Sequence, residues 1–255
     1  MITYESLGRK KINGDHISAS CYWEGMTNTS DSSEAANPKR YHHGNLVEAL
    51  IAATVEIIEE RGAEHVSVRE AAKRAGVSPG APFRHFRSKS ALLTAVAEQA
   101  MNRLTEAVAN AQSNVDSADP IVAFEAIGQG YLEWAISNPT HFQIISSRTL
   151  IDFDASDSLR DQNEAIRRKM IDLLIQAQQQ GRLAPDTDFD HLVLAARAFV
   201  YGLARMAIDG HFPEWHPSEP PSLAARRALH LFMSRMTISS KAQSPEHPEV
   251  ACGDR

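Results

Sequence analysis

The chain of 255 residues is poor in cysteine. Its two cysteines, Cys21 and Cys252, lie in polar stretches near opposite ends. A disulfide-stapled domain carries several cysteines at regular spacings, and a structural zinc site needs clusters of Cys and His. The sequence therefore indicates neither a disulfide framework nor a cysteine metal centre.

Long apolar runs and a secretory leader are also lacking. No stretch of 18 consecutive apolar residues occurs, so we expect no membrane span. The opening segment MITYESLGRKKINGD has no apolar core, so we expect no signal peptide. Met26 opens a segment that resembles an ordinary short arm, which makes residues 1–25 a candidate extension from an upstream start codon. The simplest interpretation is a cytoplasmic protein.

Patterns typical of catalysis are missing as well. No Ser-His-Asp or Cys-His arrangement has a recognisable context, and no glycine-rich phosphate loop follows a strand. His42, His43, His211 and His216 do not pair at i, i+4 spacing on a helix beside an acidic residue, as a zinc site would require. We expect no enzyme activity, no metal and no cofactor.

Apolar residues recur at helical spacing through most of the chain, and no alternating strand pattern is visible. Hydrophobic residues make up 43% of the sequence, which is enough to bury a core. The predicted helices span about 45–61, 89–112, 120–137, 140–150, 158–180, 188–209 and 222–238, with glycine stops at Gly62, Gly181 and Gly210. A proline-rich loop is expected over 213–221. The polar ends, 1–40 and 241–255, have the composition of disordered arms.

The string VSVREAAKRAGVSP predicts two short helices joined by a tight turn. Ser67 followed by Glu70 is a capping box that starts the first helix, and Gly76 is a suitable stop for it. Ser78 is expected to cap the next helix, with Pro79 at its first position. Two helices around so short a turn form a helix-turn-helix, whose second helix can enter the DNA major groove.

Charge is distributed unevenly along the chain. The whole sequence has 26 Lys+Arg and 32 Asp+Glu, a net of -6. Residues 67–89 hold six basic residues and one acidic residue, a net of +5, so the other 232 residues sum to -11. A small basic patch on an acidic body suits a protein that holds phosphates with one surface. Ordinary surface helices also carry such runs, so the charge counts only together with the turn chemistry.

The string Gly-Val-Ser-x-Gly-x-x-x-Arg-His-Phe-x-Ser-Lys, from Gly76 to Lys89, is far more specific than a bare helix-turn-helix. With its surroundings, from Tyr41 to Glu98, it resembles the N-terminal DNA-binding domain of the TetR family of transcriptional regulators. The later string YGLARMAIDGHFP resembles a helix of one branch of that family more weakly. The resemblance implies an all-α fold, with a three-helix DNA-binding domain over residues 41–88 and a larger helical ligand-binding and dimerisation domain over 89–240.

The resemblance also assigns contacts to DNA. Ser67 and Arg69, at the start of one helix, are candidates for a phosphate contact and a guanine contact, with a purely structural cap as the alternative for Ser67. Small residues are expected to open the recognition helix and let its backbone approach the base edges, although simple helix-start chemistry explains them equally well. The full set of DNA-binding candidates is Ser67, Arg69, Ser78, Pro79, Gly80, Ala81, Phe83, Arg84, His85 and Lys89.

Two positions depart from the family pattern. Phe83 replaces the usual Tyr, whose hydroxyl reaches a phosphate, so that polar contact is in doubt here. Ser90 replaces the acidic residue that usually follows the Lys. Arg84, His85 and Lys89 remain as phosphate ligands, although His85 has packing as an alternative role. Phe86 is expected to lie in the core of the three-helix domain.

A ligand site is expected inside the helical body, because bundle interiors commonly bind small molecules. For each aromatic or flexible apolar residue there, ordinary core packing is the alternative. Arg103 and Arg148 would face either an acidic ligand or a surface carboxylate. The ligand-binding candidates are Arg103, Phe124, Tyr131, Trp134, Phe142 and Met170.

We therefore expect a homodimeric, ligand-responsive transcription factor, most simply a repressor that an unknown small-molecule effector releases from a palindromic operator. The helix at 188–209 is apolar on more than one face, so we expect one face to pack on its own body and another to meet a second copy. The last helix could lie beside it, and two such helix pairs would form a four-helix interface about a two-fold axis. The expected partners are double-stranded DNA, a second copy and the effector, with no membrane. The alternatives are an effector-independent DNA-binding activator and a helical enzyme or carrier with an incidental basic helix pair.

Overall fold

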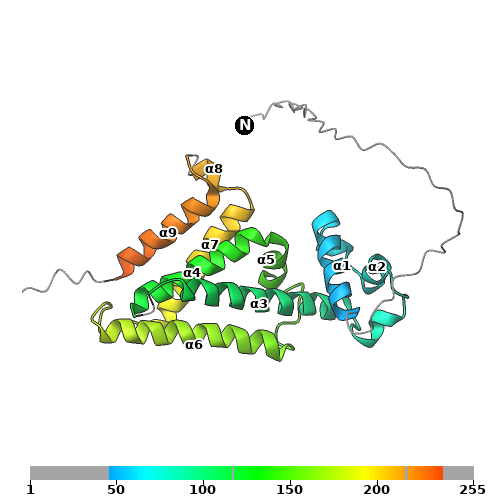
Figure 1. Cartoon of the computed structure of the whole chain (residues 1–255), viewed down its shortest axis with the longest axis horizontal. Coiled ribbons are helices and arrows are strands. Elements are labelled where there is room, and N and C mark those ends of the chain that lie inside the picture. Colours follow the sequence, from blue (N-terminus) through cyan, green and yellow to red (C-terminus); the bar gives the residue numbers. More distant parts are fainter. Residues whose placement is uncertain (1–45, 117, 216–217, 238–255) are drawn as a thin grey trace, which may run out of the picture. The chain divides into compact units, whose positions relative to one another are not determined.

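The computed structural model describes residues 46–116, 118–215 and 218–237, and within these ranges the fold is all-α, as predicted (Figure 1). The described residues belong to one unit, His42–Arg255. Its helices are α1 (Leu46–Arg61), α2 (Val68–Arg74), α3 (Lys89–Ser113), α4 (Pro120–Ser137), α5 (Pro139–Ser146), α6 (Asp157–Gln179), α7 (Phe189–Ile208), α8 (Phe212–Trp215) and α9 (Pro221–Met236), with short 3₁₀ turns η1 (Ala63–His65) and η2 (Ala81–Arg84). The two expected arms lie outside the described residues, as do Cys21, Cys252, His42, His43 and His216.

Most predicted helix bounds agree with the structure to within a few residues. The helix predicted over 120–137 is α4, and the one predicted over 188–209 is α7. The helix near 140–150 is shorter than predicted, because α5 ends at Ser146. The short helix α8 occupies part of the stretch that was expected to be a proline-rich loop.

Local chemistry sets where α2 begins and ends. The Ser67 hydroxyl accepts a hydrogen bond from the backbone N–H of Glu70 at 3.1 Å, so Ser67 is the N-cap. Gly76 follows the helix with a φ of 67°, a conformation that a residue without a side chain adopts readily. The other three predicted stops also have positive φ, and they are Gly62, Gly181 and Gly210.

The prediction of where the recognition helix begins is wrong. Ser78 is not a helix cap and Pro79 is not a first helical residue, because both precede the 3₁₀ turn η2, which begins after Gly80. In an α-helix capped by Ser78, the backbone nitrogen of Pro82 would have to donate to the Ser78 carbonyl, and proline has no N–H. The tighter turn avoids this loss, and the N–H of His85 bonds to the Pro82 carbonyl at 2.9 Å.

One long helix joins the helix-turn-helix to the body. α3 packs against α1 near its start and along α4 further on. Gly130 of α4 allows a close approach there, because a Cβ at this position would lie 2.9 Å from the Cβ of Ala111 and 3.0 Å from the carbonyl of Ala107. α4 also contacts α6, α7 and α9, so it lies at the centre of the body.

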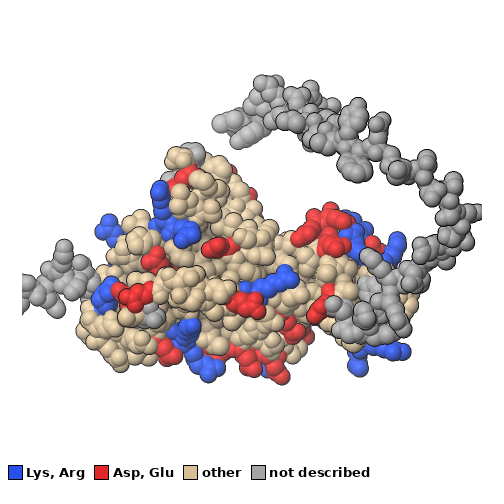
Figure 2. All heavy atoms as spheres, viewed as in Figure 1, with Lys and Arg blue, Asp and Glu red and all other residues tan. Residues whose placement is uncertain are grey.

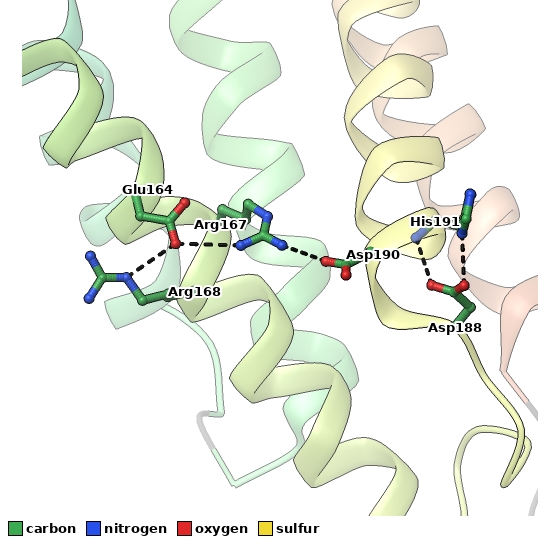
Figure 3. A network of polar contacts seen from close by, with 6 residues as sticks. All are labelled: Glu164, Arg167, Arg168, Asp188, Asp190 and His191. Atoms are coloured by element: carbon green, nitrogen blue, oxygen red, sulfur yellow. Dashed lines mark hydrogen bonds and ion pairs between the residues drawn. The ribbon is translucent and has the colours of Figure 1, made fainter.

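Polar contacts fasten α6 to α7 (Figure 3). Arg167 of α6 lies 2.5 Å from Asp190 of α7 and 3.4 Å from Glu164 of its own helix. Asp188 caps α7 by accepting hydrogen bonds from the backbone N–H of His191 and from its imidazole. These bonds lower the pKa of Asp188, and the Asp188 carboxylate raises the pKa of His191. The Arg167–Asp190 pair orients α6 against α7, whereas the Asp188–His191 contacts are local to the start of α7. The side chains of both pairs are accessible to solvent, so the pairs add little stability.

Among the described residues, α7 alone is long and apolar enough to cross a membrane by length and composition. The expectation of no span rested on unbroken apolar runs, which Arg197 and Arg205 interrupt in this helix. Helices packed in the core of a globular protein pass the same test, and α7 packs against α4, α6 and α9. On its other side Leu194 is 62% exposed. That uncovered side of α7 is a candidate contact surface.

Candidate nucleic-acid interface and ligand cavity

Most residues predicted to bind DNA have exposed side chains. The exposed members are Ser67, Arg69, Ser78, Pro79, Gly80, Phe83, Arg84 and His85, whereas Ala81 and Lys89 are half-buried. One shallow hollow brings several of them together, since Ser78, Gly80 and Arg84 line it side by side. The segment from α2 to η2 therefore presents its polar groups on the surface.

Some basic side chains of this region are already paired within the protein. Arg74 lies 2.5 Å from Glu60 and also near Glu56, both on α1, and Arg61 of α1 lies 2.7 Å from Glu70 of α2. The hydrogen bonds from the arginines lower the pKa of Glu60 and Glu70, and Glu60 raises that of Arg74. These pairs orient α2 against α1, and they remove Arg74 from the charge available to phosphates.

Four other basic residues remain available. Arg69, Lys73, Arg84 and Arg87 are exposed, and none forms an ion pair with another residue of the described chain. Lys and Arg side chains appear in Figure 2 at the end of the molecule that carries α2. Lys73 and Arg87 were counted in the charge of the segment but were not predicted as contacts. The charge count was the only signal for them, because neither belongs to a recognised motif position.

Lys89 has a structural role in the free protein. Its ammonium donates to the backbone carbonyl of Glu64 at 3.0 Å and so ties the start of α3 to η1. An ammonium has three donors, so this bond leaves two for a phosphate.

Of the two phenylalanines in this segment, one is buried and the other is exposed. Phe86 is 6% exposed and lies in the core, which confirms that prediction, whereas the ring of Phe83 is 43% exposed. His85 is exposed and so is accessible to a phosphate, and its ring centroid also lies 6.4 Å from that of Phe86.

A partly open cavity, the interior cavity, lies in the body and is lined by residues of α3, α4, α6, α7 and α9. Its volume is about 70 Å³ and its walls are mostly apolar. Ligand pockets for drug-sized molecules occupy roughly 300–1,000 Å³, so a ligand of that size requires the walls to move. Three of the lining residues are methionines, Met101, Met170 and Met233, whose flexible side chains can rearrange.

Three of the predicted ligand residues line this cavity, namely Phe124, Tyr131 and Met170. Phe142 does not, because it is fully buried behind the cavity wall. Its ring centroid lies 6.1 Å from that of Tyr131 and 5.6 Å from that of Tyr201, so it supports both tyrosines.

Arg103 and Trp134 also lie away from the cavity. Nη1 of Arg103 is 3.4 Å from Nε2 of His141 on α5. Trp134 is buried in the core, and its indole N–H has no hydrogen-bond partner among the described residues. Helical periodicity places such residues on an inner face, but it does not show which of them border an empty space.

A few polar groups reach the cavity wall. Arg197 donates to Oδ1 of Asn163 at 2.9 Å, and Glu125 pairs with His230 at 3.1 Å. Burial raises the pKa of Tyr131 to about 12, so its hydroxyl stays protonated at neutral pH. Sequence reasoning missed Arg197, because a single arginine in an apolar helix carries no motif.

Two family signatures match the chain. "Bacterial regulatory proteins, tetR family" matches residues 50–96, and "Tetracyclin repressor-like, C-terminal domain" matches residues 124–232. The HTH-type transcriptional regulator BetI of Yersinia pestis (strain Pestoides F) is 37% identical over 81 residues, which cover 32% of this chain and 41% of that protein. The match thus spans less than half the length of this curated relative.

Solved structures agree with the fold. A protein of unknown function from Rhodococcus sp. RHA1 has a TM-score of 0.66 and 27% identity, and the match covers 79% of this chain and all of that one. The TetR family regulator PfmR of Thermus thermophilus has a TM-score of 0.56 and 18% identity, over 72% of this chain and 97% of that one.

An exposed helix-turn-helix on a helical body defines a DNA-binding transcriptional regulator. The chain belongs to the TetR family of transcriptional regulators, which is a family of regulators and not of enzymes. The enzyme alternative is thereby set aside.

Proposed function

We propose that this regulator is a repressor that binds a roughly palindromic operator as a homodimer in the cytoplasm and leaves it when a small molecule occupies the body. The observation that carries the proposal is the exposed set of basic residues at the helix-turn-helix, Arg69, Lys73, Arg84 and Arg87, which lack ion-pair partners in the described chain. DNA phosphates would supply the missing anions.

The second copy is proposed to cover the exposed sides of α7 and α9. Leu194 of α7 is 62% exposed and Leu231 of α9 is 57% exposed. The two helices pack together through the stacked rings of Phe199 and Phe232, whose centroids are 4.4 Å apart. Two such helix pairs about a two-fold axis would form a four-helix interface, and the two recognition segments could then enter successive major grooves.

The effector is proposed to act through α3. Met101 and Leu104 of this helix line the cavity, and the same helix packs against α1 of the helix-turn-helix. A ligand that enlarges the cavity would favour one position of α3 over another. It releases DNA only if it binds the DNA-free conformation more tightly than the DNA-bound one.

Selection of DNA from a random-sequence library by the purified protein tests the proposal. We expect enrichment of an inverted repeat that binds two protomers, and an affinity that falls steeply with salt. Enrichment of no sequence, or no binding at low salt, would contradict it. In a deletion strain, transcription beside the operator should rise for a repressor, whereas a fall would identify an activator.

A further inference from the structure

A second pocket adjoins the interior cavity and shares part of its wall. This outer pocket, of about 280 Å³, lies between the end of α5 and α7. Tyr131 and Arg197 line both the outer pocket and the interior cavity. A molecule in the outer pocket can therefore reach the interior cavity by displacing these two side chains.

The outer pocket carries two arginines without a carboxylate partner. Arg148 and Arg197 both line it, and neither forms an ion pair with any residue that the structure describes. Arg197 is held by the neutral amide of Asn163, and the Arg148 guanidinium lies 3.3 Å from the ring centroid of Phe153. Burial lowers the pKa of Arg148, Arg197 lowers it further, and Asp154 acts in the opposite direction. An anion placed between the two guanidinium groups would relieve their repulsion.

The surrounding groups fit such an anion. The hydroxyls of Tyr131 and Tyr201 can donate hydrogen bonds from the walls of the outer pocket. The carboxylate that lines the interior cavity, Glu125, lies 3.1 Å from Nδ1 of His230, on the α9 side of that cavity and not in the outer pocket. Beyond Tyr131 the interior walls are mostly apolar, which suits a hydrocarbon and not a second charge.

We infer that the effector is an organic anion with an apolar body, whose head group, such as a carboxylate, lies between Arg148 and Arg197 and whose apolar part extends past Tyr131 into the interior cavity. The inference rests on the proposed effector-binding function and names the chemical class of ligand. The planar fork of arginine matches a carboxylate with two parallel hydrogen bonds, so both charge and shape contribute to the preference.

The position of the head group also suggests how occupancy reaches the second copy. Leu194 and Ala198 line the outer pocket, and both are exposed on the side of α7 that is proposed to meet the second copy. A ligand that shifts α7 at these residues would change the angle between the two copies, and with it the spacing of their recognition segments.

Isothermal titration calorimetry of the full-length protein without DNA tests the inference, with octanoate, 1-octanol and octylammonium as matched probes. We expect octanoate to bind at least about tenfold more tightly than 1-octanol, because charge-assisted hydrogen bonds are the stronger ones, and octylammonium to bind weakest. Arg148→Gln and Arg197→Gln should each weaken octanoate by about tenfold and leave 1-octanol unchanged. Lysine at either position should restore part of the loss, because it keeps the charge without the fork.

Arg168→Gln is the matched control, because Arg168 is an exposed arginine of α6 that pairs with Glu164 and lines neither space. Equal binding of octanoate and 1-octanol, binding of none of the three probes, or an unchanged preference in folded Arg148→Gln and Arg197→Gln would overturn the inference. Operator binding by the same samples separates the two proposals. A protein that binds its operator without any preference for the carboxylate keeps the DNA-binding function and loses this inference.

Discussion

At the scale of single residues, Arg84 and Lys89 are both proposed to hold phosphates but have different surroundings. Arg84 is exposed without an ion pair in the described chain, whereas Lys89 already bonds to the Glu64 carbonyl. We expect Arg84→Ala and Lys89→Ala to weaken binding to all DNA sequences about equally and to lower the salt slope by about one each. Lys89→Ala should also lower the melting temperature, since it loses an internal hydrogen bond. Fluorescence anisotropy at several salt concentrations measures the first effect.

The control for these two variants is Arg168→Ala, which removes an arginine of α6 outside the helix-turn-helix and should leave the salt slope unchanged. A variant of Arg84 that loses sequence preference but keeps its salt slope would identify Arg84 as a base reader and not a phosphate contact.

Arg69 is proposed to read a base from the first turn of α2. Arg69→Ala should cost about 1–3 kcal/mol on the selected operator and relax the preference at one base pair per half-site. Equal losses on operator and random DNA would make Arg69 a phosphate clamp. Phe83→Tyr is the companion variant, because the exposed ring of Phe83 can carry a hydroxyl without burying it. Modestly tighter binding would show that the family's phosphate contact is merely missing here, and unchanged affinity would place the ring away from the DNA backbone.

At the scale of helices, the buried His141 links three elements. His141 belongs to α5 and is 8% exposed. Its imidazole lies against Arg103 of α3 and interacts electrostatically with Glu59 of α1. Burial lowers its pKa below the ordinary value of 6.5, Arg103 lowers it further, and Glu59 acts in the opposite direction. The unfolded chain therefore takes up a proton at a higher pH than the folded protein. The stability contributed by neutral His141 is present above pH 6.5 and is lost as the pH falls through the folded pKa.

His141→Gln should accordingly flatten the loss of thermal stability between about pH 7 and pH 5, as measured by melting temperature against pH. His191→Gln is a control of opposite sign. Asp188 raises the pKa of His191. The stability contributed by protonated His191 is therefore present at low pH and is lost as the pH rises through the folded pKa. An unchanged slope in His141→Gln would show that other groups govern the acid transition.

Helix positions were largely predictable, because caps and stops act over a few residues. The predicted cap Ser67 begins α2, and the predicted stops Gly76 and Gly210 follow helix ends with positive φ. The start of the recognition segment was not predicted, because Ser78 and Pro79 have the local chemistry of a helix start. The decisive residue is Pro82, further along the chain, whose missing N–H disfavours an α-helix that begins at Ser78. The cavity was predicted only in part, because a helical face shows which residues point inward and not where packing leaves space. No sequence pattern indicated a role for Arg197, because its contact with Asn163 depends on the packing of α6 against α7.

At the scale of the whole molecule, the proposed dimer needs a surface that the chain leaves uncovered. Phe199 does not offer it, because its ring stacks on Phe232 of the same chain. Phe199→Glu would therefore disturb the fold of one copy, and it cannot test the interface alone. Ala198 and Leu231 are exposed on the neighbouring helices α7 and α9, and they are the better positions for a charge.

Ala198→Lys and Leu231→Glu should each yield monomers, because a charge buried at an interface without a partner is costly. Lysine is the test at position 198, because Arg148 and Arg197 line the same outer pocket and would pair with a carboxylate. Operator affinity should collapse although the DNA-reading residues are unchanged, since two half-sites must then be bound independently. Ile175→Glu is the control, because Ile175 is a partly exposed apolar residue of α6, away from the proposed surface. Leu231 lines neither pocket, so its variant also separates loss of the dimer from loss of ligand. Sedimentation velocity decides the matter, because stable dimers with normal operator binding in both variants would place the interface elsewhere.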